Sequence, residues 1–508
     1  MRTWTGLLAL TTVVVLAAGT GCDAIAGPDP TSSPSAPRVE RKATNPPPGL
    51  PASFTTGQRL TWAACPAPSE AQGGGKAPGN AWECATMKAP LDYRRPTRAT
   101  IKVALIRKKA TGPDRKRMGS LLFNFGGPGQ PGVVGLPKFA RDYARLGERY
   151  DLVSFDPRGV GATIPVKCGE GRAYGGGDGC EKYSGRVLPY VGTSQTARDM
   201  DLMRYLLGDQ KLHYLGVSYG TRIGGVYAHL FPKNVGRLVL EAPIDPTLNH
   251  LESDLGQARA AQFAFDRFAR QCATTYTDCP LGRDPEQANQ RVIDLLSKLE
   301  KKPAPTGGDE KLDDSLAAHA IADFLGLGEQ RWRPLAEALT AVMKRGDGSE
   351  LFTGGDGSVP QSRPRGKAPG ETNAPAFASI TCADSNVRPG FTGLEEMIKR
   401  VEAASPVFGG TWSKTVYLCY EWPFKGERAN PDVSADGAAP VLVVANTGDP
   451  TTPYEGAERM ADELGEGVGV LLTVRDEGHG SYPHNHCAAK AVNTYLLDGK
   501  LPATSCGK

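Results

Sequence analysis

From residue 101 onward, short apolar runs alternate with amphipathic stretches along the chain. This alternation is typical of strands and crossover helices wound into a mainly parallel sheet, because each buried strand needs a covering helix before the next strand begins. The apolar runs that we assign to strands cover residues 101–106, 121–125, 152–155, 212–215, 238–240, 441–445 and 470–474. The pattern therefore predicts the α/β class, with a doubly wound sheet.

A helix is predicted over residues 194–207, between the third and fourth of these strands. Ser194 can cap its first turn and Gly208 can end it. The resulting βαβ unit leads directly to residues 216–220, which read Gly-Val-Ser-Tyr-Gly.

Between residues 247 and 376 the hydrophobic period becomes that of helices, with few β-branched runs. Helical stretches are predicted at 255–273, 287–299 and 316–343. A loop rich in Gly, Pro and Ser follows at 354–373. Because the sheet resumes at Val441, we expect this segment, 247–376, to form a helical cap over a catalytic domain made of residues 57–246 and 377–508.

The N-terminal segment predicts export. Arg2 precedes an apolar stretch, residues 7–18, that is too short to span a bilayer and suits the core of a signal peptide. We therefore assign residues 1–26 to a signal peptide. Two processing routes remain open, cleavage after Ala26 or lipidation of Cys22 as in a bacterial lipoprotein.

Residues 27–56 are rich in Pro, Ser and Ala. Such a composition buries too little apolar surface to offset the entropy of ordering, so it predicts a linker. We expect a secreted or cell-surface protein, with a membrane tether only through a lipidated Cys22.

The chain contains 11 cysteines. Either processing route removes Cys22 from the pool, and the even number that remains in an exported chain predicts disulfides. Sequence does not fix connectivity, but proximity along the chain favours Cys65 with Cys84, Cys168 with Cys180, Cys272 with Cys279, Cys382 with Cys419, and Cys487 with Cys506. A metal site is not expected, because the chain has no CxxC pair and no zinc-type histidine spacing.

Charge excludes one class of partner. Lys and Arg number 59 and Asp and Glu 55, for a formal net charge of +4 without a basic block. Nucleic acid is therefore not an expected partner. No cofactor is expected either, and the sequence does not indicate an oligomeric state.

Ser218 is the predicted nucleophile. It follows the strand at 212–215 and precedes a helix predicted at 221–231. The flanking glycines leave room for a sharp strand-to-helix turn that would present the hydroxyl at the carboxyl edge of the sheet. An ordinary glycine-rich βα turn would give the same motif, so the partners of Ser218 must decide.

A serine hydroxyl needs a base and an acid that orients the base, in the chain order Ser, Asp, His for the α/β-hydrolase fold. Asp449 follows the strand at 441–445, and His479 follows the strand at 470–474. Both positions suit a triad. His484 and His486, a few residues further on, compete with His479 for the role of base.

Acyl transfer also needs donors for the developing oxyanion. The strand at 121–125 runs into Gly-Gly-Pro-Gly at 126–129, so we expect the amides of Gly127 and Tyr219 to form the oxyanion hole. Asp156 and Arg158 end another strand, and we expect them to fix neighbouring loops rather than to perform chemistry.

Taken together, these motifs resemble those of secreted actinobacterial tripeptidyl aminopeptidases, which are relatives of prolyl iminopeptidase. The resemblance extends from Gly57 to the C-terminus. It rests on residues 126–129, 156–161, 216–220, 380–384 and 419–423 and on the loops of Asp449 and His479. Two departures are Phe125, where the iminopeptidase pattern has His, and the pair Gln130-Pro131 after the loop.

The resemblance implies an exopeptidase with a helical cap over the serine site and a C-terminal segment, from about residue 407, that carries the acid and the base. Relatives of this kind bind the substrate ammonium group with acidic cap residues. By position the candidates here are Asp384 and, behind it, Glu421.

The expected function is therefore that of an exported serine exopeptidase that releases short peptides, such as tripeptides, from free N-termini through an acyl-enzyme. A secreted esterase or amidase with the same machinery is the first alternative. A non-catalytic binding protein on a hydrolase scaffold is the second, although such scaffolds usually lose a member of the triad.

Overall fold

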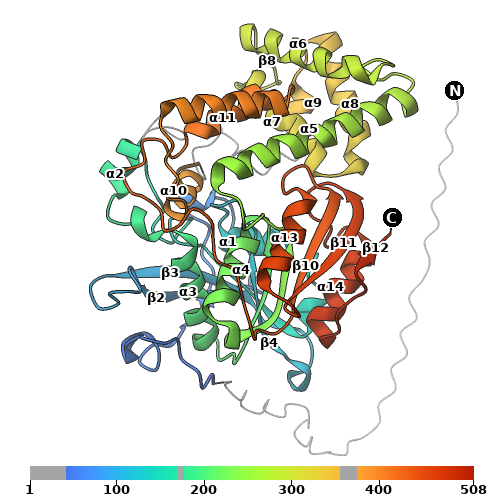
Figure 1. Ribbon diagram of the computed structural model, residues 1–508. Helices are drawn as coiled ribbons and strands as arrows, with labels where there is room; N and C mark the ends of the chain where they lie inside the picture. The colour runs from blue at the N-terminus through green and yellow to red at the C-terminus, as the bar shows by residue number, and fades with distance from the viewer. Residues whose placement is uncertain (1–41, 170–176, 355–373, 508) are drawn as a thin grey trace, which may run out of the picture. The chain divides into compact units, whose positions relative to one another are not determined.

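A ten-stranded sheet forms the centre of the catalytic domain in the computed structural model, which describes residues 42–169, 177–354 and 374–507 (Figure 1). The predicted signal peptide and Cys22 lie outside the described residues. The strands follow the order β1-β2-β3-β5-β4-β6-β7-β10-β11-β12. Pairings within β1-β2-β3-β5 are antiparallel, and the others are parallel.

Each predicted strand is present. The bounds are β1 (Ala63–Ala64), β2 (Glu83–Pro90), β3 (Thr100–Lys108), β4 (Gly119–Asn124), β5 (Tyr150–Phe155), β6 (Leu212–Val217), β7 (Val235–Glu241), β10 (Val441–Gly448), β11 (Gly469–Glu477) and β12 (Ser505–Cys506). Strands β1, β2 and β12 were not predicted. The sheet and its crossover helices are those of an α/β-hydrolase.

Helices cover both faces of this sheet, because its central strands are apolar on both sides. In β10, Val441 and Val443 belong to the core on one face, while Leu442 and Val444 belong to the core on the other. Helices α3 (Thr193–Leu206), α4 (Tyr219–Leu230) and α13 (Tyr454–Leu464) pack on the first face, and α1 (Gly132–Phe139) and α14 (His486–Asp498) on the second. Helix α3 is capped by Gly192 and not, as predicted, by Ser194, whose hydroxyl instead donates to Glu427.

A cap of helices lies between β7 and β10. Its first part comprises α5 (His250–Thr275), α6 (Ala288–Lys301), α7 (Asp314–Gly326), α8 (Trp332–Thr340) and α9 (Ser349–Thr353), with a two-stranded sheet of β8 (Ala304–Pro305) and β9 (Lys311–Leu312). These helices share a hydrophobic core of their own. The stretch at 316–343, predicted as one helical stretch, is divided by Gly328, whose φ of 88° interrupts the helix.

The cap has a second part beyond residue 376, the end of its predicted range. Helix α11 (Phe391–Ala404) and α12 (Gly409–Trp412), with the turn that follows to Tyr417, pack on α5 through a separate apolar cluster. Between the two parts, α10 (Ala374–Asp384) returns to the catalytic core. The start of α5 and the end of α10 meet where His250 Nδ1 lies 2.9 Å from Ser385 Oγ.

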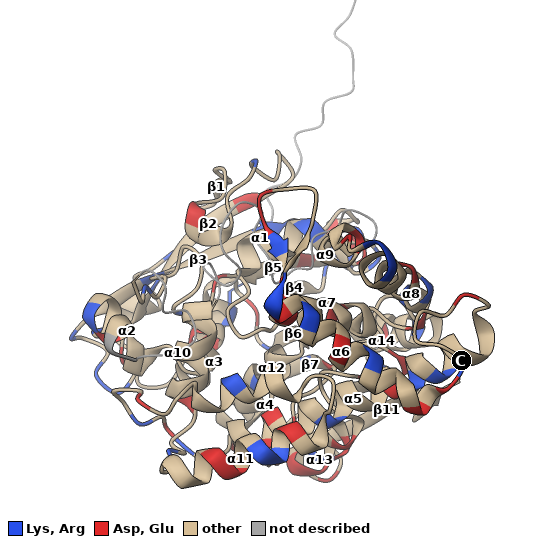
Figure 2. Cartoon of the chain, turned by 90° about the horizontal axis from the view of Figure 1, so that it is seen from above, with Lys and Arg blue, Asp and Glu red and all other residues tan. Residues whose placement is uncertain are grey.

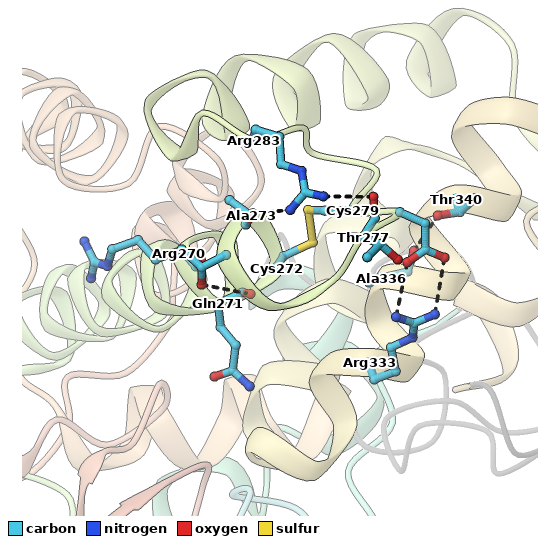
Figure 3. Close-up of a disulfide and its surroundings, with 12 residues drawn as sticks. Arg270, Gln271, Cys272, Ala273, Thr277, Cys279, Arg283, Arg333, Ala336 and Thr340 are labelled. Atoms are coloured by element: carbon cyan, nitrogen blue, oxygen red, sulfur yellow. Dashed lines mark hydrogen bonds and ion pairs between the residues drawn. A yellow bond between two sulfur atoms is a disulfide. The ribbon is translucent and has the colours of Figure 1, made fainter.

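Five disulfides join the pairs favoured by proximity along the chain. Cys272–Cys279 closes the turn after α5, where Arg283 donates to the carbonyls of Ala273 and Thr277 (Figure 3). Cys382–Cys419 joins α10 to the segment that returns from the cap.

The exposed faces of the helices carry charges of both signs, which lie close together along α6 and α11 (Figure 2). Within the three described ranges, no helix combines the length and the apolar character that crossing a bilayer requires.

Part of the predicted linker is packed on the catalytic domain. The guanidinium of Arg204, which is fully buried, donates to the carbonyl oxygen of Asn45 at 2.8 Å and to its side-chain oxygen at 3.0 Å. Phe54 is buried in the main core. Residues 42–56 are therefore held by buried polar and apolar contacts, which differs from the solvated linker expected from composition.

Arg158 joins three segments around the sheet, in line with the structural role expected of it. Its guanidinium makes a two-point contact with Asp199 on α3, at 2.6 and 2.8 Å. It also donates to the carbonyls of Pro90 and Leu91 at the end of β2, each at 2.6 Å. The side chains of Arg158 and Asp199 are each 1% exposed, so the charge of each is neutralised by the other and not by water.

We expect Arg158→Met to destabilise the fold by about 3–5 kcal/mol, because it leaves Asp199 buried and unpaired. The measurement is urea unfolding at neutral pH. Arg94→Met is a matched control, since Arg94 pairs with Asp92 with its own side chain 80% exposed, and it should change stability by less than about 1 kcal/mol. An equal loss of unfolding free energy in both variants would contradict the structural role of Arg158.

Candidate active site

Ser218 occupies a strained turn between β6 and α4. Its φ of 57° and ψ of −123° lie outside the regions that non-glycine residues normally adopt. The turn is also crowded. A Cβ on Gly216 would lie 2.5 Å from the Gly220 carbonyl oxygen, and one on Gly220 would lie 2.8 Å from that of Asn124. The two glycines therefore permit the turn that places Ser218 at the carboxyl edge of the sheet.

The loop at residues 126–129 lies directly against this turn. A Cβ on Gly126 would lie 2.6 Å from the carbonyl oxygen of Val217 and 3.0 Å from Cβ of Ser218. The amides of Gly127 and Tyr219 donate to no atom of the described residues. Both residues line the same cavity as Ser218, so two backbone donors are available beside the hydroxyl.

Asp449 and His479 are hydrogen-bonded to each other at the ends of β10 and β11. The Nδ1 atom of His479 lies 3.1 and 3.0 Å from the two carboxylate oxygens of Asp449. The amides of Thr451 and Thr452 donate to the same carboxylate, each at 2.8 Å. Asp449 is thus fixed from several sides, and it orients the imidazole.

The competing histidines lie elsewhere. His484 and His486 are exposed, beyond the loop that carries His479. Burial disfavours the charged form of His479, but the adjacent Asp449 carboxylate outweighs burial and raises the pKa of the imidazole above its usual value. An imidazole of this kind is a stronger proton acceptor.

A cavity of about 600 Å³ connects these groups to the cap. Its lining includes Ser218, Gly127, Tyr219 and Asp449 from the catalytic domain and a face of α5 from the cap. Acidic and basic side chains both reach it, namely Asp245, Asp254, Asp384, Glu455, Arg222, Arg259 and Arg459.

Asp384 lies in this cavity, as its predicted role requires, but it already has partners. The amide and the hydroxyl of Thr193 each donate to its carboxylate at 2.6 Å, and Arg222 lies 3.7 Å away. The Thr193 hydroxyl is in turn 2.6 Å from the Tyr219 hydroxyl. Glu421 is exposed and is not among the residues that line the cavity.

Comparison with known proteins agrees with this geometry. A family model described as TAP-like protein matches residues 405–506. The serine protease Hip1 of Mycobacterium tuberculosis is 32% identical over 494 residues, which cover 88% of this chain and 90% of that protein. The chain belongs to the Hip1 family.

Other proteins similar to this member of the Hip1 family carry different names. The tripeptidyl aminopeptidase of Streptomyces lividans is 29% identical over 457 residues, covering 83% of this chain and 82% of that protein. Carboxylesterase B of M. tuberculosis is 30% identical over 460 residues, covering 83% of this chain and 85% of that protein. The relatives are thus named as a serine protease, as an aminopeptidase and as an esterase.

In this member of the Hip1 family, Asp254 is a cavity carboxylate that sequence reasoning missed. It extends from α5 of the cap and accepts a hydrogen bond from Thr415 at 3.0 Å. No Lys or Arg of the described residues lies within ion-pair distance of it. Removal from bulk water raises the pKa of Asp254 to about 7, and the Thr415 hydrogen bond opposes this only partly. Its position in an amphipathic helix gave no signal of this role.

Glu241, at the end of β7, is a buried acid near the site. Its Oε1 accepts hydrogen bonds from the Ser481 hydroxyl at 3.0 Å and from the Tyr482 amide at 3.2 Å. Burial raises its pKa to about 7. Its backbone carbonyl accepts a hydrogen bond from the Ser218 amide at 2.9 Å. Glu241 therefore links the turn at Ser218, the serine turn, to residues 478–482, which carry His479 and are called the histidine loop below.

The raised pKa of Asp254 predicts a pH-dependent stability. Because the folded protein binds this proton more tightly than the unfolded chain, the contribution is fully present below about pH 4 and is lost as the pH rises through about 7. In Asp254→Asn this loss is absent. Melting temperatures from pH 4 to 8 should diverge in favour of the variant up to about pH 7 and then run parallel. A constant difference would contradict the prediction.

Proposed function

We propose that the chain is an exported serine exopeptidase that releases short peptides, tripeptides among them, from free N-termini. The observation that carries the proposal is the strained Ser218 turn, which lines a cavity under the cap together with Asp449, the hydrogen-bond partner of His479. The names of the relatives, a serine protease and tripeptidyl aminopeptidases, support the peptidase class.

In this mechanism His479 takes the proton of the Ser218 hydroxyl through Nε2, while its Nδ1–H donates to Asp449. The serine oxygen attacks the scissile carbonyl carbon. The tetrahedral intermediate collapses when His479 returns the proton to the leaving amine. The N-terminal fragment is then an ester of Ser218, and a water molecule that loses its proton to His479 hydrolyses this ester.

The amides of Gly127 and Tyr219 would stabilise the negative oxygen of both tetrahedral intermediates. They are fixed by the loop and by the start of α4, so they need not reorganise during the reaction. Loss of one such donor typically costs about 3 kcal/mol of transition-state stabilisation.

Export is supported by the disulfides. Five bridges in one chain are typical of proteins that fold in an oxidising compartment. The apolar stretch at residues 7–18 supports the same conclusion, and lipidation of Cys22 would add a membrane tether.

An exopeptidase must bind the ammonium group of its substrate, and two cavity carboxylates can do so. Asp384 lies closer to the serine turn, through Thr193 and Tyr219, but Arg222 already offsets its charge. Asp254 has no cationic partner among the described residues, which favours it as a second contact for an incoming cation. Glu421 is exposed, and its position away from the cavity does not favour this role.

An esterase is the second candidate function, because a relative named carboxylesterase B is 30% identical. Peptides and esters pass through the same type of tetrahedral intermediate, so the serine machinery serves both.

The deciding experiment offers the protein tripeptide amides with free and with acetylated N-termini, beside short acyl esters. We expect the free peptides to be the best substrates, and Ser218→Ala to lose activity by at least about 10⁴-fold together with labelling by a fluorophosphonate probe. Turnover of esters alone would refute the peptidase assignment. Equal labelling of the wild type and the variant would refute the nucleophile.

The role of Asp384 is tested by Asp384→Asn, which keeps an acceptor for Thr193 and removes the charge. If Asp384 binds the ammonium group, the preference for free over acetylated N-termini should fall about tenfold or more. Asp254→Asn, measured in parallel, assigns the contact to one carboxylate or to both. An unchanged preference in the Asp384 variant would exclude Asp384.

A further inference from the structure

The cap touches the loop that carries His479, and it does so through backbone atoms. The carbonyl oxygen of Gly326, the last residue of α7, accepts a hydrogen bond from the His479 amide at 2.7 Å. This bond fixes the backbone of the histidine itself. It comes from the cap and not from the catalytic domain.

The turn after α7 approaches the same loop too closely for side chains on either side. A Cβ on Gly478 would lie 2.8 Å from the Cα and N atoms of Gly328 and 3.0 Å from the Gly326 carbonyl oxygen. A Cβ on Gly328 would lie 2.9 Å from the carbonyl oxygen of Glu477. The cap and the histidine loop are therefore in direct backbone contact.

An ion pair reinforces this contact from a second cap helix. The guanidinium of Arg267 on α5 pairs with the carboxylate of Glu477, which precedes the histidine by two residues. Glu477 is 4% exposed, and its second oxygen lies against Gly448, next to Asp449. Arg267 is not among the residues that line the cavity, so it has no direct route to the substrate.

The catalytic domain holds the other side of the loop. The side-chain amide of Asn446 donates to the carbonyls of Gly478 and Gly480, at 2.9 and 3.0 Å, and Glu241 accepts from Ser481 and Tyr482. The histidine loop is thus clamped between the sheet and the cap.

We propose that Arg267 and the turn at Gly326–Gly328 are positioning residues for the catalytic histidine, so that the cap contributes to the chemical step as well as covering the substrate. The inference rests on the proposed function of Ser218, Asp449 and His479. It follows that changing these cap residues should lower kcat for every substrate, including one too small to touch the cap.

The test compares Arg267→Met and Arg267→Lys with Arg333→Met. Arg333 is the matched control, because it is also a partly exposed arginine of the cap and pairs with Asp278 and Glu337 instead of with a residue adjacent in sequence to the histidine loop. Figure 3 shows Arg333 in the surroundings of the Cys272–Cys279 disulfide. Each variant is assayed with a free tripeptide amide and with a short acetyl ester, and its melting temperature is recorded.

We expect Arg267→Met to lower kcat about tenfold for peptide and ester alike, with KM changed by less than about twofold, because a small displacement of the base weakens proton transfer. Arg267→Lys should restore most of the rate, and Arg333→Met should behave as the wild type.

Gly328→Ala supplies an independent variant, with Gly346→Ala as its control. Both glycines have positive φ, 88° and 69°, but a Cβ on Gly346 would meet nothing within 4 Å. We expect only Gly328→Ala to lower kcat for both substrates.

Other outcomes would overturn the inference. Arg267 would not act through His479 if Arg267→Met and Arg333→Met had the same kcat for both substrates. The same conclusion would follow if Arg267→Met lowered kcat for the peptide but not for the ester. A wild-type protein that neither turned over substrate nor reacted with a fluorophosphonate would instead refute the proposed function, and the inference with it.

Discussion

The close approach of β6 and α4 around Ser218 is the constraint on which the site depends. A non-glycine residue with φ of 57° is held there only because its surroundings leave no alternative. Gly216, Gly220 and Gly224 allow that approach, since a Cβ at each would lie within 3 Å of neighbouring atoms. The strain is local, and the packed sheet and helix compensate for it.

The same edge of the sheet sets the electrostatics around the base. Asp449 is 1% exposed and Glu241 is fully buried, so two carboxyl groups lie near one imidazole in surroundings that screen charge weakly. Hydrogen bonds from the backbone hold both acids in place. The histidine loop is therefore held by the catalytic domain through polar side-chain contacts and by the cap through the Gly326 carbonyl and the Arg267–Glu477 ion pair.

Much of this could be predicted from the sequence, and the exceptions have physical reasons. The parallel strands are continuous apolar runs, and the disulfides join cysteines separated by 7 to 37 positions, so local patterns were sufficient. Strand β2 was missed because its buried positions are Ala85, Met87, Ala89 and Pro90, which have little β propensity. The packing of residues 42–56 on the domain includes the contact of Asn45 with Arg204, 159 positions away in the chain, which a local pattern cannot indicate.

The candidate site likewise contains residues that the sequence predicts and one that it does not. Ser218, Asp449 and His479 follow strand ends, and a parallel sheet brings strand ends together. Asp254 lies within an amphipathic helix, and only the packing of α5 against the catalytic domain turns it toward the cavity. His250 and Ser385 are in contact where the chain enters the two parts of the cap, the first at the start of α5 and the second between α10 and α11. If the cap rocks about this contact, α5 acts as a lever arm of roughly 25 Å between His250 and Arg267, so a tilt of about 5° moves the far end by about 2 Å. Such a displacement exceeds what the hydrogen bond between Gly326 and His479 can tolerate. The angle of α5 and the position of His479 are therefore geometrically coupled through the contact of the cap with the histidine loop.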